Sequence, residues 1–113
     1  MLTSISDKDC QRFEEIRKSL QVLGHKESEF VKIELLFFEV LSISKTYGED
    51  PGQNSFLAEL RKLQHDQYEK TKNATRKANE RESAIRRFIV ALRKILSDAC
   101  QEATVICSQR NFP

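Results

Sequence analysis

The chain has 113 residues, of which 39% are hydrophobic and 32% are charged, with three Gly, two Pro and no Trp. So much charge with so few helix-breaking residues is typical of helical bundles and coiled coils, and it argues against a β-sandwich or a barrel. The net charge is only +2, but residues 61–94 hold eleven Lys and Arg against four Asp and Glu. We expect one domain over residues 1–113 with a basic middle segment.

Cysteine usage and hydropathy indicate the compartment. An odd number of cysteines (Cys10, Cys100 and Cys107) without framework spacing argues against a disulfide-stapled secreted domain. The first residues show no apolar signal-peptide core, and the longest apolar run, residues 88–92, is far too short to span a bilayer. We therefore expect a cytoplasmic or nuclear protein without a transmembrane segment.

A first helix is predicted over residues 6–23. Ser6 with Asp9 three residues later resembles a capping box, in which Asp replaces the usual Glu. The apolar residues that follow are spaced by three or four and form one helical stripe: Cys10, Phe13, Ile16, Leu20 and Leu23. Gly24 then marks the end of this helix.

A second helix is predicted over residues 28–47, and it is the most apolar part of the chain. Its main seam has 3-4-3 spacing and consists of Ile33, Leu36, Val40 and Ile43. Further apolar residues, such as Leu35 and Phe38, lie on other sides, so the helix should be covered on several sides. The segment from Gly48 to Asn54, with two Gly and one Pro, is a loop.

From Ser55 to Ser108 the chain contains neither Gly nor Pro. One heptad frame runs along this segment, through polar Gln64 and Gln67 in its first half and apolar residues near its end. A continuous helix over residues 55–108 would be about 80 Å long. The favoured architecture is therefore all-α, with a helical hairpin packed on a long, coiled-coil-like C-terminal helix.

An alternative architecture keeps the all-α class but divides this segment. Asn79 could cap a fourth helix with Glu82 at its third position, which puts a break near residues 79–83. Four helices of comparable length would then form an up-down-up-down bundle.

Catalytic and metal-binding patterns are missing from the sequence. It contains no Gly-rich phosphate loop, no nucleophile elbow and no H-E-x-x-H motif. Cys100 and Cys107 are seven residues apart, which on a helix separates them by about 10 Å, too far to share one metal ion. We expect a non-enzymatic protein without cofactor or metal.

The apolar seams lead to the first functional hypothesis, a helical interaction or oligomerisation module. It would self-associate, as a homo-oligomer, or dock a partner helix. The expected partner-binding residues are Ile33, Leu36, Val40, Ile43, Ile85, Phe88, Leu92 and Ile95.

The basic segment 61–94 leads to the alternative hypothesis, binding of nucleic acid or anionic lipid. The candidate anion-binding residues are Lys72, Arg76, Lys77 and Arg81. Against nucleic acid stands the shortage of aromatic residues for base stacking, because Tyr68 is the only one between positions 57 and 87. Against a membrane stands the lack of Trp or Phe beside these cations.

Overall fold

The computed structural model describes residues 5–24, 26–73 and 78–111, apart from the side chains of residues 27, 78–79 and 100–111. The order of elements is α1 (Asp7–Val22), a 3₁₀ turn η1 (Glu27–Glu29), α2 (Phe30–Lys45), α3 (Ser55–Leu63), η2 (Gln64–Tyr68), α4 (Glu69–Asn73) and α5 (Ala78–Asn111). The all-α class and the long C-terminal helix are confirmed, and no strand occurs in this part of the chain.

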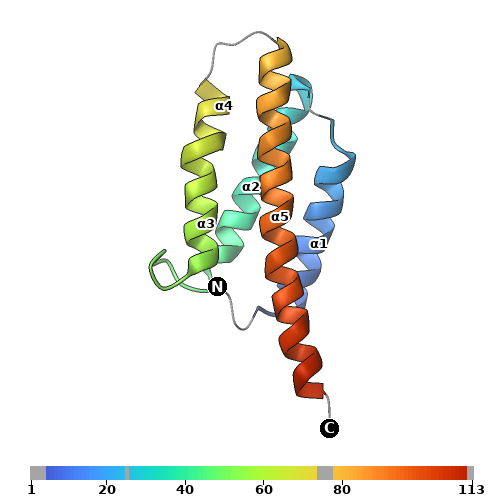
Figure 1. Ribbon diagram of the computed structural model, residues 1–113, viewed down its shortest axis with the longest axis vertical. Coiled ribbons are helices and arrows are strands. Elements are labelled where there is room, and N and C mark those ends of the chain that lie inside the picture. Colours follow the sequence, from blue (N-terminus) through green and yellow to red (C-terminus); the bar gives the residue numbers. More distant parts are fainter. Residues whose placement is uncertain (1–4, 25, 74–77, 112–113) are drawn as a thin grey trace.

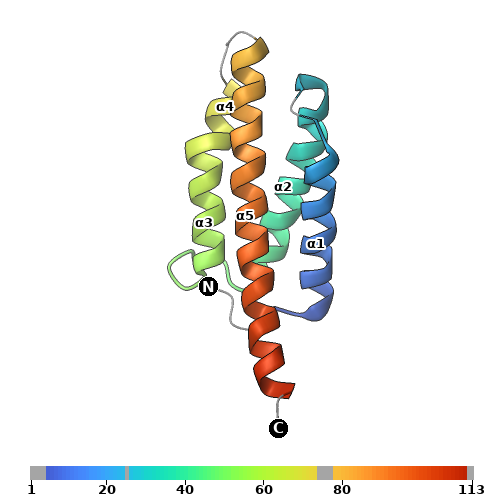
Figure 2. The ribbon, with the colours of Figure 1, turned by 45° about the vertical axis from the view of Figure 1, so that its right-hand side comes forward.

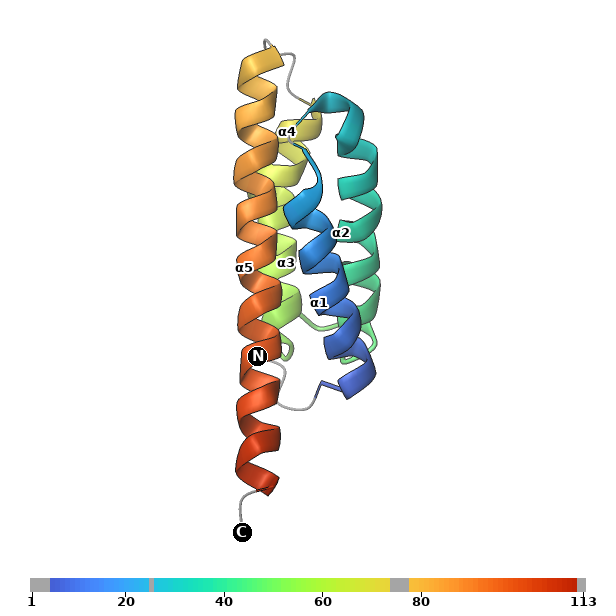
Figure 3. The same cartoon turned by 90° about the vertical axis from the view of Figure 1, so that its right-hand side faces the viewer.

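The helices form an up-down-up-down bundle (Figure 1). α3, η2 and α4 make one helical run, which lies beside α5 and antiparallel to it (Figures 1 and 2). α1 contacts α2 and α5, and α2 contacts α3, so the helices are arranged around a square, and α2 also contacts α5 across the bundle. α5 also continues well past the ends of the other helices at the C-terminal end (Figure 3).

The arrangement corrects the favoured prediction of one helix over residues 55–108. α3 packs against α5, and a straight helix cannot pack against its own continuation. The longest dimension of the molecule is 56 Å, well short of the length such a helix would have. The alternative has the right number of helices, but its break at residues 79–83 is misplaced, because α4 ends at Asn73 and residues 79–83 lie within α5.

Local capping explains where α1 and α3 begin. The Ser6 hydroxyl accepts a hydrogen bond from the backbone N–H of Asp9 (3.1 Å), as the capping-box pattern predicts. Asn54 caps α3 by accepting from the N–H of Leu57 (3.0 Å), and its amide donates to the carbonyl of Ser44 at the end of α2 (3.0 Å). Asn54 is buried, so one side chain fixes the turn between the two helices. Gly48 starts this loop with a φ of 135°, which few other residues adopt.

The core lies along the axis of the bundle and receives residues from α1, α2, α3, η2 and α5. Its fully buried large side chains include Phe13 and Ile16 of α1, Phe37 of α2 and Leu60 of α3. α5 contributes one continuous stripe of buried side chains, Ile85, Phe88, Ile89, Leu92 and Leu96. The hydrophobic effect of this shared core holds α5 against the hairpin of α1 and α2.

Candidate functional site

The residues expected to bind a partner lie mostly in the protein's own core. Ile33 and Val40 of α2 are fully buried, as are three of the four residues expected on α5: Ile85, Phe88 and Leu92. The remaining three, Leu36, Ile43 and Ile95, are half-buried and pack against the core. In this fold these side chains fill the bundle itself and are not open to a second protein.

An aromatic cluster joins α2 to α5 and to η2. It consists of Phe30, Phe37, Phe38, Tyr68 and Phe88. Phe37 and Phe88 meet edge to face, with ring centroids 5.0 Å apart. The Tyr68 ring contacts all four of the other rings, at centroid distances of 5.4 to 6.0 Å. Tyr68 is therefore the centre of the cluster.

A turn of π-helix places Tyr68 in this position. In η2 the backbone N–H of Glu69 donates to the carbonyl of Gln64, which widens the turn by one residue. As a result Leu63 and Tyr68 point into the core, while Gln64 and Gln67, the residues of the heptad frame, stay half-buried at its edge. The wide turn thus lets the helix bury an aromatic ring in place of two polar amides.

The Tyr68 hydroxyl reaches the edge of the core and donates a hydrogen bond to the carboxylate of Glu34. Burial raises the pKa of Tyr68 well above its ordinary value, and the bond to Glu34 raises it further. The phenol therefore stays protonated in the folded protein. This bond ties η2 to α2.

Three large apolar side chains of α2 remain exposed on one side of the helix. Val31, Leu35 and Phe38 are 61%, 65% and 42% exposed. Their spacing of four and three residues puts them on one stripe, which we name the α2 face. Phe38 is anchored at one border of the stripe by an edge-to-face contact with Tyr68, at a centroid distance of 5.5 Å.

Charged side chains border the α2 face and are paired. Arg12 of α1 donates to both carboxylate oxygens of Glu39, and one of these bonds is 2.7 Å long. This bond holds the pKa of Glu39 below its ordinary value. Lys32 lies 3.6 Å from the Glu29 carboxylate. The α2 face therefore combines an apolar centre with a polar border, the arrangement found in protein interfaces.

The structure describes two of the four predicted anion-binding residues, Lys72 and Arg81, and both contact other groups of the protein. Arg81 donates to the backbone carbonyl of Thr71, and its guanidinium lies 5.9 Å from the centre of the Phe30 ring. The Lys72 ammonium lies 5.9 Å from the centre of the Tyr68 ring. Arg76 and Lys77 lie outside the described residues. The two described cations thus contact the end of the aromatic cluster.

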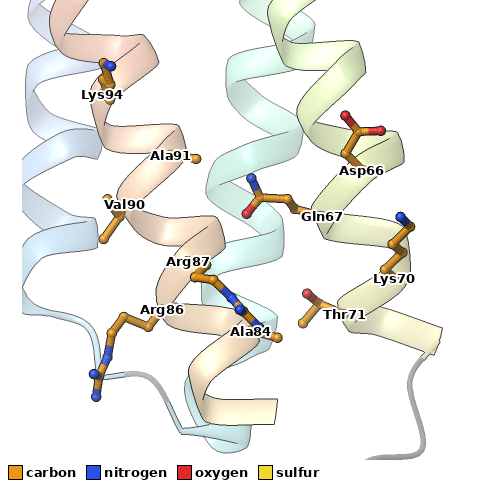
Figure 4. Close-up of a pocket in the computed structure, with 10 residues that line it drawn as sticks. All are labelled: Asp66, Gln67, Lys70, Thr71, Ala84, Arg86, Arg87, Val90, Ala91 and Lys94. Atoms are coloured by element: carbon orange, nitrogen blue, oxygen red, sulfur yellow. The ribbon is translucent and has the colours of Figure 1, made fainter. Parts of the chain in front are cut away.

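Other cations do gather around a hollow, between α4 and the first half of α5 (Figure 4). This hollow has a volume of about 570 Å³, and we name it the basic pocket. The cations lining it are Lys70, Arg86, Arg87 and Lys94. Asp66 is the one acidic residue among the described residues that line it. Its apolar lining residues are Ala84, Val90 and Ala91.

Sequence reasoning did not identify the α2 face, and it identified the basic segment 61–94 without the pocket that four of its cations line. The α2 face had a readable signal, because Val31, Leu35 and Phe38 repeat every three or four residues and lie off the main seam. The basic pocket has no such signal, because its lining residues come from η2, α4 and α5, which lie side by side only after the chain has folded back. Among the described residues, no group of three or more His, Cys, Asp or Glu could hold a metal ion.

Comparisons with known proteins do not assign the chain to a family. Within the described ranges, no helix has the length and apolar character needed to cross a membrane. A scan against protein-family models gave no match, and searches of the curated proteins and of the solved structures found no significant similarity.

Proposed function

We propose that this protein is a non-enzymatic helical interaction module, and that its α2 face pairs with the α2 face of a second copy. The observation that carries the proposal is the exposure of Val31, Leu35 and Phe38 on one stripe of an otherwise well-packed bundle. Neighbouring apolar side chains bordered by paired charges are a common mark of interaction sites.

Charge complementarity favours a second copy of the chain, in the antiparallel orientation. Consider a two-fold axis that lies in the interface near Leu35 and perpendicular to α2. It makes the two copies of α2 antiparallel, and residues on one side of the stripe in one copy lie on that same side in the other. Lys32 and Glu39 lie on the same side of the stripe, since Lys32 comes one turn before Leu35 and Glu39 comes one turn after it. Lys32 of each copy would then lie opposite Glu39 of the other, and Leu35 would pack near the axis.

The size of the face implies a weak and reversible pair. A stable interface buries about 800 Å² on each partner. Three partly exposed side chains supply only a fraction of that area, so we expect a dissociation constant on the order of 100 µM.

The first test is sedimentation equilibrium over a wide range of protein concentration. The wild-type chain should pass from monomer to dimer, and Leu35→Glu should keep it monomeric, because a charge at the axis would be buried unpaired. The matched control is Val22→Glu on α1, which adds the same charge at a side chain that is 84% exposed and lies off the α2 face. A wild-type chain that stays monomeric throughout, or a Val22→Glu variant that is equally impaired, would overturn the proposal.

The second test fixes the orientation. Lys32→Glu puts two acidic residues opposite each other in its own dimer, and Glu39→Lys does the same with two lysines. Each variant alone should associate more weakly than the wild type at low salt. An equimolar mixture should associate more strongly than either alone, because both charge pairs are restored across an antiparallel interface. A mixture no stronger than its components rules out the antiparallel pairing of these residues.

A further inference from the structure

The basic pocket lies between two walls that come from different parts of the sequence. Asp66, Gln67 and Lys70 stand on the wall formed by η2 and α4, and Ala84, Arg87 and Ala91 stand on the wall formed by α5. Arg87 extends from α5 toward α4, and Gln67 extends from η2 toward α5 (Figure 4). Its volume of about 570 Å³ is within the usual range of small-molecule sites, roughly 300 to 1,000 Å³.

The cations of this pocket have no carboxylate partner in the part of the chain that the structure describes. Among the described residues, Lys70, Arg86, Arg87 and Lys94 form no ion pair, whereas Arg12 and Arg17 on α1 each bind a carboxylate. Asp66 cannot balance four positive charges. Like charges around one hollow repel each other, and an anion bound there would relieve the repulsion.

The side chains that line the pocket limit the class of ligand that it can bind. No aromatic side chain appears among the described residues lining the pocket, so it offers no platform on which nucleic-acid bases could stack. Among the described residues that line the pocket, Val90 is the one large apolar side chain that is exposed. One such side chain is too small an apolar surface for insertion into a bilayer. A compact, soluble, highly charged anion fits these conditions better than either polymer or membrane.

We propose that the basic pocket binds a small soluble anion carrying two or more phosphate groups. Arg87 extends from α5 toward α4 and Lys70 lines the pocket from α4, so the two hold separate phosphates, and Arg87 can donate two hydrogen bonds to one of them. Lys94 extends the positive field along α5. Arg86 points to the side of α5 away from α4 and acts only from a distance (Figure 4).

Arg81 has a positioning part in this site. It donates from α5 to the carbonyl of Thr71, the buried residue that follows Lys70 on α4. This bond links the two walls at the end of the pocket where Lys70 stands. The Arg81 guanidinium also rests near the Phe30 ring, which ties the link to the aromatic cluster.

The test is isothermal titration calorimetry of the full chain with sodium tripolyphosphate at low and moderate salt. Arg87→Gln and Lys70→Gln should each weaken binding about tenfold, because each removes a charge-assisted hydrogen bond. Arg86→Gln should weaken it only about twofold, through the field alone. The matched control is the double variant Lys8→Gln and Lys18→Gln, which removes two charges from exposed sites on α1.

Three outcomes would overturn the proposal. An equal loss in the α1 control and in the double variant Lys70→Gln with Arg87→Gln would mean general attraction to a cationic protein. Absence of tripolyphosphate binding, together with binding to phosphatidylcholine vesicles that contain phosphatidylserine, would assign the cations to a membrane. Tight binding of single-stranded RNA without tripolyphosphate binding would assign them to nucleic acid. Circular dichroism of each variant checks that a loss of binding is not a loss of fold.

Discussion

The α2 face and the basic pocket belong to one bundle and differ in how their charges are arranged. At the α2 face, Arg12 is paired with Glu39 and Lys32 with Glu29, so the charges form a neutral border around an apolar stripe. At the basic pocket, four cations line a hollow without an ion pair among the described residues. Paired charges suit contact with another folded surface, whereas unpaired cations suit an anion that brings its own charge.

Both regions depend on one segment, η2. Tyr68 packs against Phe38 at the α2 face, and the preceding residue, Gln67, lines the basic pocket. A substitution in the aromatic cluster should therefore affect both regions. A substitution at the border of one region should affect that region alone. Three substitutions test how far the regions are separable.

The largest effect is expected from Phe88→Ala. Phe88 is fully buried and its ring contacts both Phe37 and Tyr68. Removing it leaves a cavity between α2, η2 and α5, which should cost about 3 to 5 kcal/mol of unfolding free energy. Urea denaturation followed by circular dichroism measures the loss, and both self-association and tripolyphosphate binding should weaken with it. A loss below about 1 kcal/mol would contradict the packing of the cluster.

An intermediate effect is expected from Tyr68→Phe, which keeps the ring and removes the hydroxyl. The lost bond to the Glu34 carboxylate should cost about 1.5 kcal/mol at pH 7. Affinity for tripolyphosphate should change little, because the Tyr68 hydroxyl points to α2. A strong loss of that affinity would show that the two regions are coupled through η2.

The same variant also tests how the unfolding free energy depends on pH. The folded protein raises the pKa of Tyr68, so above pH about 10 the unfolded chain releases the phenol proton and the folded chain keeps it. The unfolding free energy must then fall as pH rises, by at most about 1.4 kcal/mol per pH unit from this group. Urea denaturation between pH 8 and 11 should show a steeper fall for the wild type than for Tyr68→Phe. Parallel curves would contradict the burial of the phenol.

The parts of the fold that sequence reasoning predicted are those with local signals. The start of α1 follows from Ser6 and Asp9, and the loop from Gly48 to Asn54 separates two clear periodic segments. The reversal between Asn73 and Ala78 is predicted only by the alternative architecture, and a few residues too late, because neither Gly nor Pro marks it. It follows from packing, since burying the stripe of α5 against α1 and α3 outweighs the local preference for a continuous helix.

The sites were harder to predict for a related reason. Periodicity identified Ile33, Val40 and Phe88 as residues that must be buried, but it cannot say whether the covering surface belongs to the same chain or to another. The basic pocket needs Lys70 and Arg87 on adjacent helices, whereas the favoured prediction places both on one helix. The π-turn that directs Tyr68 inward interrupts the heptad frame without any residue that marks it.

The smallest effect is expected from Arg12→Ala at the border of the α2 face. Both partners of the Arg12–Glu39 pair are more than a third exposed, so its loss should cost about 0.5 to 1 kcal/mol at pH 7. Arg12 lowers the pKa of Glu39, so this contribution is present above the ordinary carboxylate pKa and is lost as pH falls through the folded-state value. Urea denaturation of wild type and variant should therefore converge toward pH 3.

The same variant separates the two regions most sharply. Arg12→Ala frees Glu39 to pair with Lys32 of a second copy, so sedimentation equilibrium should show association that is retained or slightly stronger. Tripolyphosphate binding should not change, because Arg12 lies on α1 and contributes nothing to the basic pocket. Arg17→Ala, which breaks a pair with Glu14 within α1, is the matched control for stability. Weaker association in Arg12→Ala but not in Arg17→Ala would mean that Arg12 itself contacts the partner, and the border of the α2 face would then have to be extended onto α1.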